Sequence, residues 1–438
     1  MRSTVLLGIV ATAQASNSDV VEALPGLDIP VSQCWKSYTG YLDVEAGTKA
    51  LFHWYHEAVD DAASKPLPAG VGFSYPNATI DDATTASDTY EALVAFFAAH
   101  PELEGRDFYV AGGRERAAIT CRTRPAVEAG NAALPENGAA RINLKGFMVG
   151  NGYCDWQLDF NANVENGRYH ALTSQADFEA AQIACGGDFA RCFWPRDDVH
   201  CPAACGDAVE ATTKWAMDGS IDIYDIYEDV CLDADQERLK TQAFVLEAER
   251  RSRRADGFLG ATTISPVFPT CADTYVKKYL NTPAVQAAIG VRAGTIPGGA
   301  WADCGVMTSQ YEFNYASELP NYERWTKDGD LEILIYNGDA DYILSHMGNA
   351  ACCAAWIDSL NLTVASPWTA WKGSDGQVAG YFETYAASGS FTFLTVKGAG
   401  HMVPKDRPRH ALDMFARFLA GGGYDEVPAR PKVAPLCA

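Results

Sequence analysis

The sequence predicts an α/β fold in which reactive side chains follow the ends of buried strands. Phe391–Val396 is rich in aromatic and β-branched residues, which is typical of a strand, and a glycine-containing turn then leads to His401. Apolar residues in Leu412–Phe418 fall at helical spacing. A second unit of this kind places Asp341 after the apolar strand Leu331–Tyr336. Because open α/β sheets carry reactive groups outside the carboxyl ends of their strands, we expect Asp341 and His401 to lie close together.

An aspartate beside a histidine is the acid–base unit of many hydrolases. The carboxylate of Asp341 can hold the imidazole of His401 in one tautomer and stabilise its protonated form. Asp precedes His in the chain, an order that requires a serine upstream of both. Each motif alone is more typical of an ordinary turn, but their occurrence on two successive strand ends favours the catalytic interpretation.

The remaining elements of the core follow from local patterns. Asp82–His100 is an amphipathic stretch that Asp81 or Asp82 can cap, which predicts a helix. Four further strands are predicted at Ser37–Val44, Ala50–Tyr55, Asp107–Ala111 and Ile142–Val149. We expect the first two to form a hairpin on the edge of the sheet.

Composition narrows the class of protein. The chain has 438 residues, of which 48% are hydrophobic, so it can bury a large core as one α/β domain with an insertion. Its formal net charge of -22 argues against nucleic acid or an anionic membrane as a partner. The 13 cysteines predict disulfides formed in the secretory pathway.

The N-terminus and two sequons agree with that route. Met1–Ala15 has a basic residue, a short apolar run and a small-residue cleavage site before Ser16, the pattern of a secretory signal. An ordinary disordered terminus is the alternative. Asn77 and Asn361 are candidate glycosylation sites. The apolar run is too short to span a bilayer, and no later segment is a transmembrane candidate, so we expect a vacuolar, lysosomal or extracellular location.

Several motifs together resemble one known family. GAGHMVPKDRPRHALDMFARFL and LIYNGDADYI are similar to the His and Asp segments of the serine carboxypeptidases, a branch of the α/β-hydrolases. SYTGYLDV, LFHWYHEA, PAGVGFSYPNAT, FYVAG, INLKGFMVGNGYCD and CADTYVKKYLNTPAVQAAIGV match in the same order, from about residue 37 to about residue 420. The resemblance implies a doubly wound, mostly parallel sheet and a serine acyl-enzyme that releases C-terminal residues from peptides. It assigns Asp341 and His401 to the acid–base pair and implies no cofactor or metal.

The resemblance also implies a domain plan. Residues 1–15 are the signal, 16–152 and 271–420 the two parts of the core, 153–270 a disulfide-stapled cap and 421–438 a loose tail. The cap contains six of the cysteines: Cys154, Cys185, Cys192, Cys201, Cys205 and Cys231. Cys231 with Cys271 is the first disulfide that the family implies. The short spacing of Cys201 and Cys205 also fits zinc, although a secreted context without clustered histidines favours disulfides.

The expected nucleophile is missing. Where the family has Gly-Glu-Ser-Tyr-Ala-Gly, this chain has GGRERA, so Arg114 occupies the serine position and Gly113 that of a glutamate that binds substrate carboxylate. A guanidinium stays protonated and cannot attack a carbonyl. Thr120 and Cys121 are offset from this turn by several residues.

A loop is missing as well. Leu67 runs directly into Pro68, whereas the family carries a Gly-Gly-Pro-Gly-Cys-Ser-Ser loop and a buried strand there. That loop supplies oxyanion donors, part of the carboxylate pocket and a cysteine, which leaves Cys304 without its implied partner.

Both departures suggest a hypothesis about the coding sequence. Ala118–Arg122 can be encoded by codons that, in another frame, read His-Tyr-Val-Pro, the family's run after the elbow. Gly113–Arg116 can likewise be encoded by codons that read Gly-Glu-Ser in a shifted frame, although the frame shift differs from that of Ala118–Arg122. We hypothesise that residues from about 113 to 126 are partly translated out of frame and that an exon is skipped at 67–68. The functional alternatives are a carboxypeptidase, a related acyltransferase and a catalytically inactive scaffold or binding protein.

Overall fold

The structure is a computed structural model that describes most of the chain. The described residues are 4–7, 19–26, 31, 36–44, 47–56, 73–74, 80–114, 125–132, 141–193, 199–217, 219–230, 272–296, 299–301, 311–312, 316–328 and 331–426. They belong to two compact units. The first unit is Met1–Val149, Val276–Ile333 and Lys432–Ala438, and the second is Gly150–Tyr275 and Leu334–Pro431.

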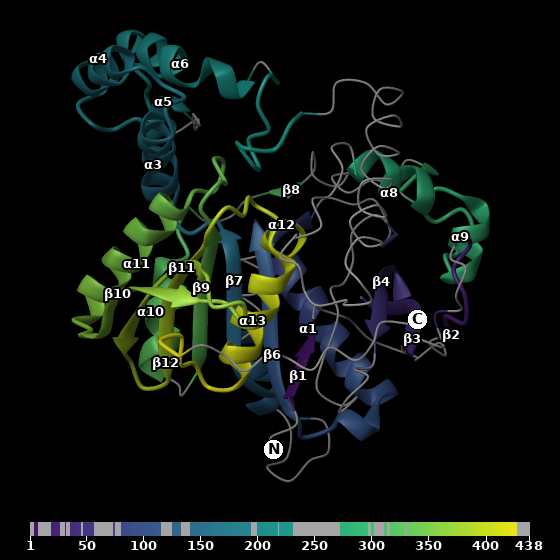
Figure 1. The fold of residues 1–438 in the computed structure, drawn as a ribbon. Helices are drawn as coiled ribbons and strands as arrows, with labels where there is room; N and C mark the ends of the chain where they lie inside the picture. The colour runs from purple at the N-terminus through teal and green to yellow at the C-terminus, as the bar shows by residue number, and fades with distance from the viewer. Residues whose placement is uncertain are drawn as a thin grey trace, which may run out of the picture. The chain divides into compact units, whose positions relative to one another are not determined.

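Seven strands form a mixed sheet in the order β1-β6-β7-β9-β12-β11-β10 (Figure 1). Their bounds are β1 Thr4–Leu7, β6 Asp107–Arg114, β7 Asn143–Gly152, β9 Glu332–Gly338, β10 Val364–Lys372, β11 Val378–Ala386 and β12 Ser390–Val396. β1 pairs with β6 in parallel, whereas β10, β11 and β12 pair antiparallel. The predicted α/β sheet is thus confirmed, with an antiparallel end that the sequence analysis did not anticipate.

The N-terminal hairpin forms as predicted, but not where predicted. β3 (Ser37–Val44) and β4 (Lys49–His56) pair antiparallel, with Gly40 opposite His53. They belong to a separate three-stranded sheet with the order β2-β3-β4, in which β2 (Asp19–Val20) pairs antiparallel with β3. The expectation that the hairpin extends the edge of the main sheet was therefore wrong. A further short pair joins β5 (Ile80–Asp81) to β8 (Tyr311–Glu312).

The helices of the first unit pack around aromatic residues. The predicted helix is α1 (Asp82–Ala99), and Asp81 is its cap, since its carboxylate accepts from Thr84 N. The others are α8 Ala272–Leu280, which begins in the second unit, α9 Pro283–Ala288, α10 Leu319–Asp328 and the short 3-10 helix η4 Pro101–Leu103; residues 125–132 are also helical. On the hairpin, Tyr41 and Phe52 pack with Phe73 and Ile289 in a buried cluster.

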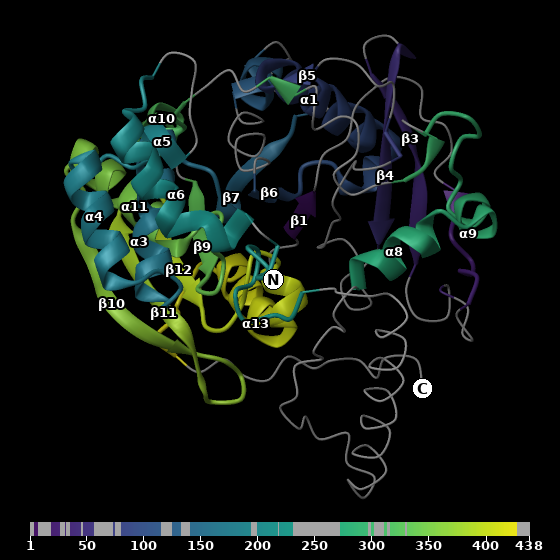
Figure 2. The ribbon, with the colours of Figure 1, turned by 90° about the horizontal axis from the view of Figure 1, so that it is seen from above.

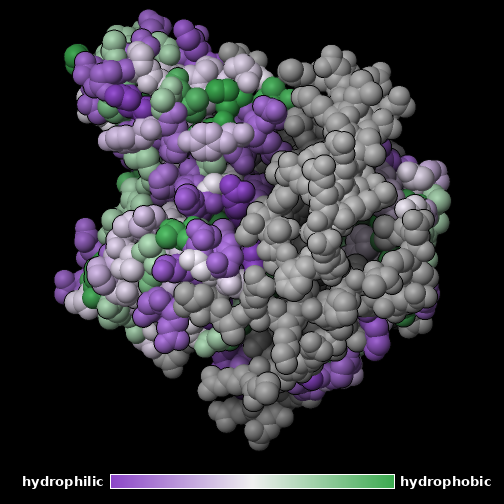
Figure 3. Space-filling view, in the orientation of Figure 1, coloured by the Kyte–Doolittle hydropathy of each residue, from purple (hydrophilic) through white to green (hydrophobic). Residues whose placement is uncertain are grey.

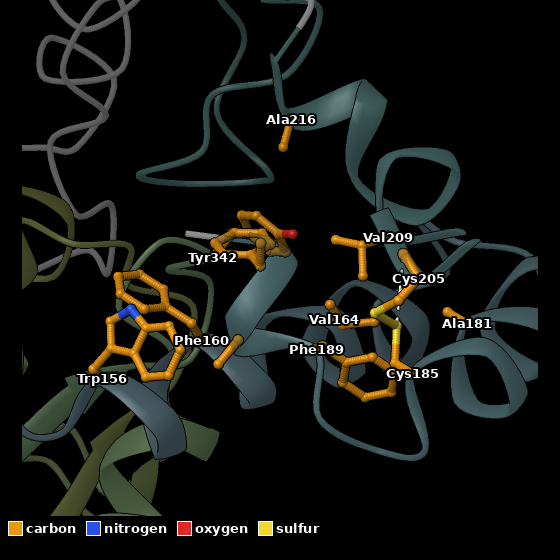
Figure 4. Close-up of a cluster of buried hydrophobic side chains, with 12 residues drawn as sticks. Trp156, Phe160, Val164, Ala181, Cys185, Phe189, Cys205, Val209, Ala216 and Tyr342 are labelled. Carbon is orange, nitrogen blue, oxygen red and sulfur yellow. Dashed lines mark hydrogen bonds between the residues drawn. A yellow bond between two sulfur atoms is a disulfide. The ribbon is translucent and has the colours of Figure 1, made fainter. Parts of the chain in front are cut away.

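Four helices of the second unit, in the segment expected to form the cap and called the cap below, share a hydrophobic core. α3 (Trp156–Tyr169) leads away from the strands to α4 (Gln175–Cys185), α5 (Ala190–Phe193) and α6 (Ala203–Met217) (Figure 1). Apolar side chains from all four helices meet in one buried cluster, which also includes Tyr342 (Figure 4). Because Tyr342 directly follows Asp341, the cap core reaches the loop that carries the predicted aspartate.

Helices cover both faces of the C-terminal strands. α11 (His346–Leu360) lies on one side of β9 and β12 and α13 (Pro408–Leu419) on the other, as Figures 1 and 2 show. Trp356 of α11 stacks on Phe391 of β12 with ring centroids 4.1 Å apart. The short helix α12 (Val403–Asp406) follows the histidine loop. This is the doubly wound arrangement predicted for this region.

The segment after α13 is anchored by Tyr424. Tyr424 is 2% exposed, and its ring lies 5.5 Å from that of Phe382. Arg417 Nη1 donates to the carbonyl oxygen of Tyr424 at 3.2 Å. Within 421–426 the chain is therefore anchored at Tyr424, while Gly421, Gly423, Asp425 and Glu426 are exposed; residues 427–438 lie outside the described part.

The candidate signal segment contains a strand. Thr4 to Leu7 pair in register with Asp107 to Val110, so this short apolar run forms β1 at the edge of the seven-stranded sheet.

Much of the described surface is hydrophilic in the space-filling view (Figure 3). Within the described residues, none of the helices combines the length and apolar character required to cross a membrane.

Candidate active site

Asp341 lies on the loop after β9 and is completely buried. Its Oδ2 accepts from His401 Nδ1 at 2.7 Å and from Asn151 Nδ2 at 2.8 Å. Its Oδ1 accepts from the backbone N–H groups of Ile343 at 3.1 Å and Leu344 at 3.4 Å. Every donor around this carboxylate therefore favours its charged form.

Burial and these hydrogen bonds have opposite effects on the pKa of Asp341. Desolvation raises the pKa of Asp341, while the hydrogen bonds from His401, Asn151 and Leu344 lower it. Burial is the larger effect, so the net shift of the Asp341 pKa is upward and the donors limit it. Loss of any one donor raises its proton affinity.

His401 follows β12, as predicted, and both its ring and its backbone N–H are held in place. The side chain is 7% exposed, and its backbone N–H donates to Tyr224 O at 2.6 Å. The Tyr224 ring lies 5.4 Å from the imidazole. Because the Asp341 carboxylate accepts hydrogen bonds, Nδ1 of His401 carries the proton and Nε2 is the free nitrogen of the neutral ring. The expected proximity of Asp341 and His401 is thus observed.

Asn151 was missed by the sequence analysis. It lies near the end of β7, is fully buried and has a φ of 43°, a left-handed conformation that asparagine tolerates better than most residues. Its Nδ2 donates to Asp341, and its Oδ1 accepts from Gly338 N at 3.0 Å. One amide therefore links the end of β7 to the end of β9 and to the aspartate. A lone asparagine between two glycines, in VGNGY, was the available signal.

Three further asparagines hold the backbone of the aspartate loop. Asn166 Nδ2 donates to Asp341 O at 3.2 Å, and Asn163 Nδ2 to Ile343 O at 3.0 Å. Asn337 Nδ2 donates to Leu344 O at 3.3 Å. Two of these side chains come from α3 of the cap, so the cap takes part directly in shaping this loop.

The structure describes little of the expected nucleophile turn. Arg114 is the last residue of β6, so the position expected for a serine does fall at a strand end. Thr120, Cys121 and the 67–68 junction lie outside the described residues.

The described cysteines of the cap form disulfides. Cys185 pairs with Cys205, and Cys192 pairs with Cys201. The zinc interpretation of Cys201 and Cys205 is therefore wrong, because each sulfur is bonded to another cysteine. A third disulfide joins Cys154 to Cys352, which are 198 positions apart in the sequence. Among the described cysteines, Cys353 is buried and free. Cys231, Cys271 and Cys304 lie outside the described residues.

Of the two sequons, the structure describes one. Asn361 caps the C-terminus of α11 with a φ of 51° and is exposed. Its side chain is therefore accessible to a glycosyltransferase. Asn77 lies outside the described residues.

The sheet with helices on both faces, the inserted cap and the disulfides place the chain in the α/β-hydrolase class. The family model of serine carboxypeptidase matches residues 68–421. The chain belongs to the serine carboxypeptidase family.

Individual relatives agree with this assignment. Serine carboxypeptidase 24 from Arabidopsis thaliana is 32% identical, over 94% of this chain and 94% of the relative. Serine carboxypeptidase-like 33 from the same plant is 29% identical, over 95% and 94% of the two chains. Among solved structures, Kex1(delta)p, a prohormone-processing carboxypeptidase from Saccharomyces cerevisiae, matches with a TM-score of 0.64 and 15% identity, covering 92% of this chain and 96% of that one. At this identity the likeness supports the fold alone.

Proposed function

We propose that the protein is built as a serine-type carboxypeptidase that releases C-terminal residues from peptides or proteins through an acyl-enzyme. The observation that carries the proposal is the 2.7 Å contact between His401 Nδ1 and Asp341 Oδ2. It leaves His401 Nε2 free to take the proton of an attacking hydroxyl and to return it to the leaving amine. The Asp341 carboxylate stabilises the imidazolium formed between these two steps.

The nucleophile is the part that this chain lacks. Arg114 cannot attack a carbonyl, so the chain as written should turn over little or no substrate. We propose that the active form reads Gly-Glu-Ser-Tyr-Ala-Gly at residues 112–117 and retains the Gly-Gly-Pro-Gly-Cys-Ser-Ser loop and its strand before Pro68. We call this version the serine form.

The serine form should hydrolyse a blocked dipeptide at acidic pH with a kcat on the order of a million-fold above that of the chain as written. The physical reason is that only the serine form can make the acyl-enzyme. Steady-state kinetics with purified protein measures the ratio. The matched control is the serine form with that one serine changed to alanine.

Two outcomes would contradict the proposal. One is a serine form no faster than its alanine control, and the other is enzyme-like turnover by the chain as written. Sequencing the transcript across residues 67–68 and 113–126 tests the coding hypothesis separately, because a cDNA identical to the present reading would remove it.

A second candidate is a catalytically inactive scaffold that binds peptides. The arginine at the end of β6 favours it, since a guanidinium can pair with a substrate carboxylate. This candidate predicts that the chain as written binds a blocked dipeptide by calorimetry without cleaving it. An acyltransferase would use the same acid–base pair, and product analysis with added alcohol or amine acceptors distinguishes it from a peptidase.

We further propose that the protein matures in the secretory pathway and acts in an acidic vacuolar, lysosomal or extracellular setting. Disulfides persist in oxidising compartments, and three are formed among the described cysteines. Asn77 and Asn361 remain proposed glycan acceptors.

Secreted expression should yield a mature chain that begins at Ser16, as N-terminal sequencing of the purified protein will measure. The three-part pattern of Met1–Ala15 is the reason. A matched variant, Leu7→Asp, interrupts the apolar run and should stay inside the cell. A secreted chain that still begins at Met1 would contradict the signal and would keep Thr4–Leu7 in place as β1.

A further inference from the structure

The segment after α6, residues 219–230, has no helix or strand of its own, yet it contacts both loops of the candidate site. We call it the strap. Its Ile223 O accepts from Tyr342 N at 3.1 Å and from Ile343 N at 3.2 Å. Its Tyr224 O accepts from His401 N at 2.6 Å, and Ile226 N donates to Ala340 O at 3.1 Å. The strap is therefore hydrogen bonded to the residues on both sides of Asp341 and to His401 itself.

The strap also packs tightly against Gly400, the residue before His401. A Cβ built on Gly400 would lie 2.4 Å from Tyr224 O and 2.5 Å from Asp225 Cβ. Both distances are well below van der Waals contact, so only glycine fits between the strap and His401. The strap backbone thus forms the surface against which the histidine loop rests.

Charged groups join the strap to α12. Lys405 Nζ lies 2.9 Å from Glu228 Oε2, with the two side chains 25% and 20% exposed. Asp406 Oδ2 accepts from Gly400 N at 2.9 Å. The carboxylates of Asp225, Glu228 and Asp406 come within 4.8 Å of one another. Lys405 is thus a cation beside this acidic group, and its pairing with Glu228 connects the strap to the helix that follows His401.

The apolar side of the strap belongs to the cap. Ile223 and Ile226 pack against the cap cluster, which contains Tyr342. Tyr342 lies with its ring 4.6 Å from that of Trp215 in α6. The strap therefore fixes the two loops to a disulfide-linked hydrophobic core.

We propose that the strap is a positioning element that holds the aspartate loop and the histidine loop at hydrogen-bonding distance, and that it transmits the rigidity of the cap to that pair. Asp341 and His401 come from different loops, 60 residues apart in the chain. A third segment bonded to both reduces the freedom of one relative to the other. The expected effect of the strap on turnover rests on the proposed function, whereas its positioning of the two loops does not.

The test is proton NMR of the chain as written, because the hydrogen bond does not require the serine. The probe is the low-field proton of His401 Nδ1, whose loss in Asp341→Asn assigns it. Gly400→Ala pushes the strap and the histidine loop apart without changing charge, and Glu228→Gln removes the ion pair with little change of shape. In each, we expect this proton to exchange with water about tenfold faster, equivalent to about 1.4 kcal/mol of lost restraint.

The matched control is Glu210→Gln, the same substitution at an exposed position of α6, which should leave the exchange rate unchanged. Near-ultraviolet circular dichroism checks that each variant is folded, and Glu228→Gln keeps the test decisive if Gly400→Ala does not fold. Parent-like exchange in folded Glu228→Gln and in any folded Gly400→Ala protein would overturn the proposal.

Kinetics separates this inference from the proposed function. In the serine form, the strap variants should lower kcat about tenfold at unchanged KM, because substrate contacts are not altered. A serine form without turnover, combined with strap-dependent proton exchange, would reject the carboxypeptidase proposal and keep the strap. Normal turnover of the serine form, combined with proton exchange that does not depend on the strap, would keep the carboxypeptidase proposal and reject the role of the strap.

Discussion

Changing Asp341 to asparagine in the serine form is expected to lower kcat about ten-thousand-fold with little change in KM. The two backbone N–H groups of Ile343 and Leu344 will attract the amide oxygen, which leaves the Nδ2 group facing His401. That group donates, so His401 Nδ1 must accept and the proton moves to Nε2. The histidine is then in the wrong tautomer to remove a proton from serine. Steady-state kinetics on a blocked dipeptide measures the effect.

The control is Asp358→Asn, a matched substitution at an exposed position of α11. It should leave kcat unchanged, because nothing in the candidate site contacts that side chain. If Asp341→Asn instead retained kcat within tenfold of the parent, the role proposed for Asp341 would be wrong even though the contact exists. If both variants lost activity equally, the loss would reflect general damage to the fold.

The second prediction with a large expected effect concerns how the free energy of unfolding depends on pH. It applies to the chain as written and does not require the serine form. Asp159 of α3 is 1% exposed, and burial raises its pKa from 3.8 to about 7. Its Oδ2 accepts from Cys154 N and Asp155 N, whereas Oδ1 is buried without a hydrogen-bond partner in the described structure. The folded state therefore keeps a proton that the unfolded state releases near pH 4. This contribution to stability is complete below pH 4 and is lost as the pH rises to about 7.

A shift from 3.8 to about 7 corresponds to a loss on the order of 4 kcal/mol of unfolding free energy across that range. Asp159→Asn has no carboxyl proton to lose, so the difference in unfolding free energy between the variant and the parent should shift in favour of the variant by about that amount from pH 4 to pH 7. Urea unfolding at several pH values measures this. Asp358→Asn should retain the parent slope, and equal slopes for the parent and Asp159→Asn would show that Asp159 does not control it.

Other carboxyl groups act in the same direction as Asp159. Burial, with the neighbouring carboxylates of Asp406, Glu228 and Asp222, raises the pKa of Asp225 to about 6. Burial also raises the pKa values of Asp339 and Asp406. All of these groups bind protons more tightly in the folded state, which favours folding at acidic pH, whereas burial lowers the pKa values of His53 and His346 to about 4 and acts in the opposite direction.

The strand ends and their reactive residues could be predicted because the signals are local. Phe391–Val396 and Leu331–Tyr336 have the apolar composition of buried strands, and each ends at a polar turn. The order of Asp341 and His401 then suggested the pair. The disulfide connectivity could not be predicted, since several pairings of the cap cysteines satisfy the same spacing and only folding brings Cys185 to Cys205 and Cys192 to Cys201.

Local residue patterns were enough to predict the α/β class and the strand-end positions of Asp341 and His401. The three-dimensional structure was needed to show that Asn151 joins the pair, that the strap contacts both loops and that Tyr424 is buried. The difference lies in the range of the interactions. Apolar periodicity and turn residues act over a few positions and are visible in the chain, whereas a hydrogen bond from Asn151 to Asp341 joins residues 190 positions apart and leaves no local pattern.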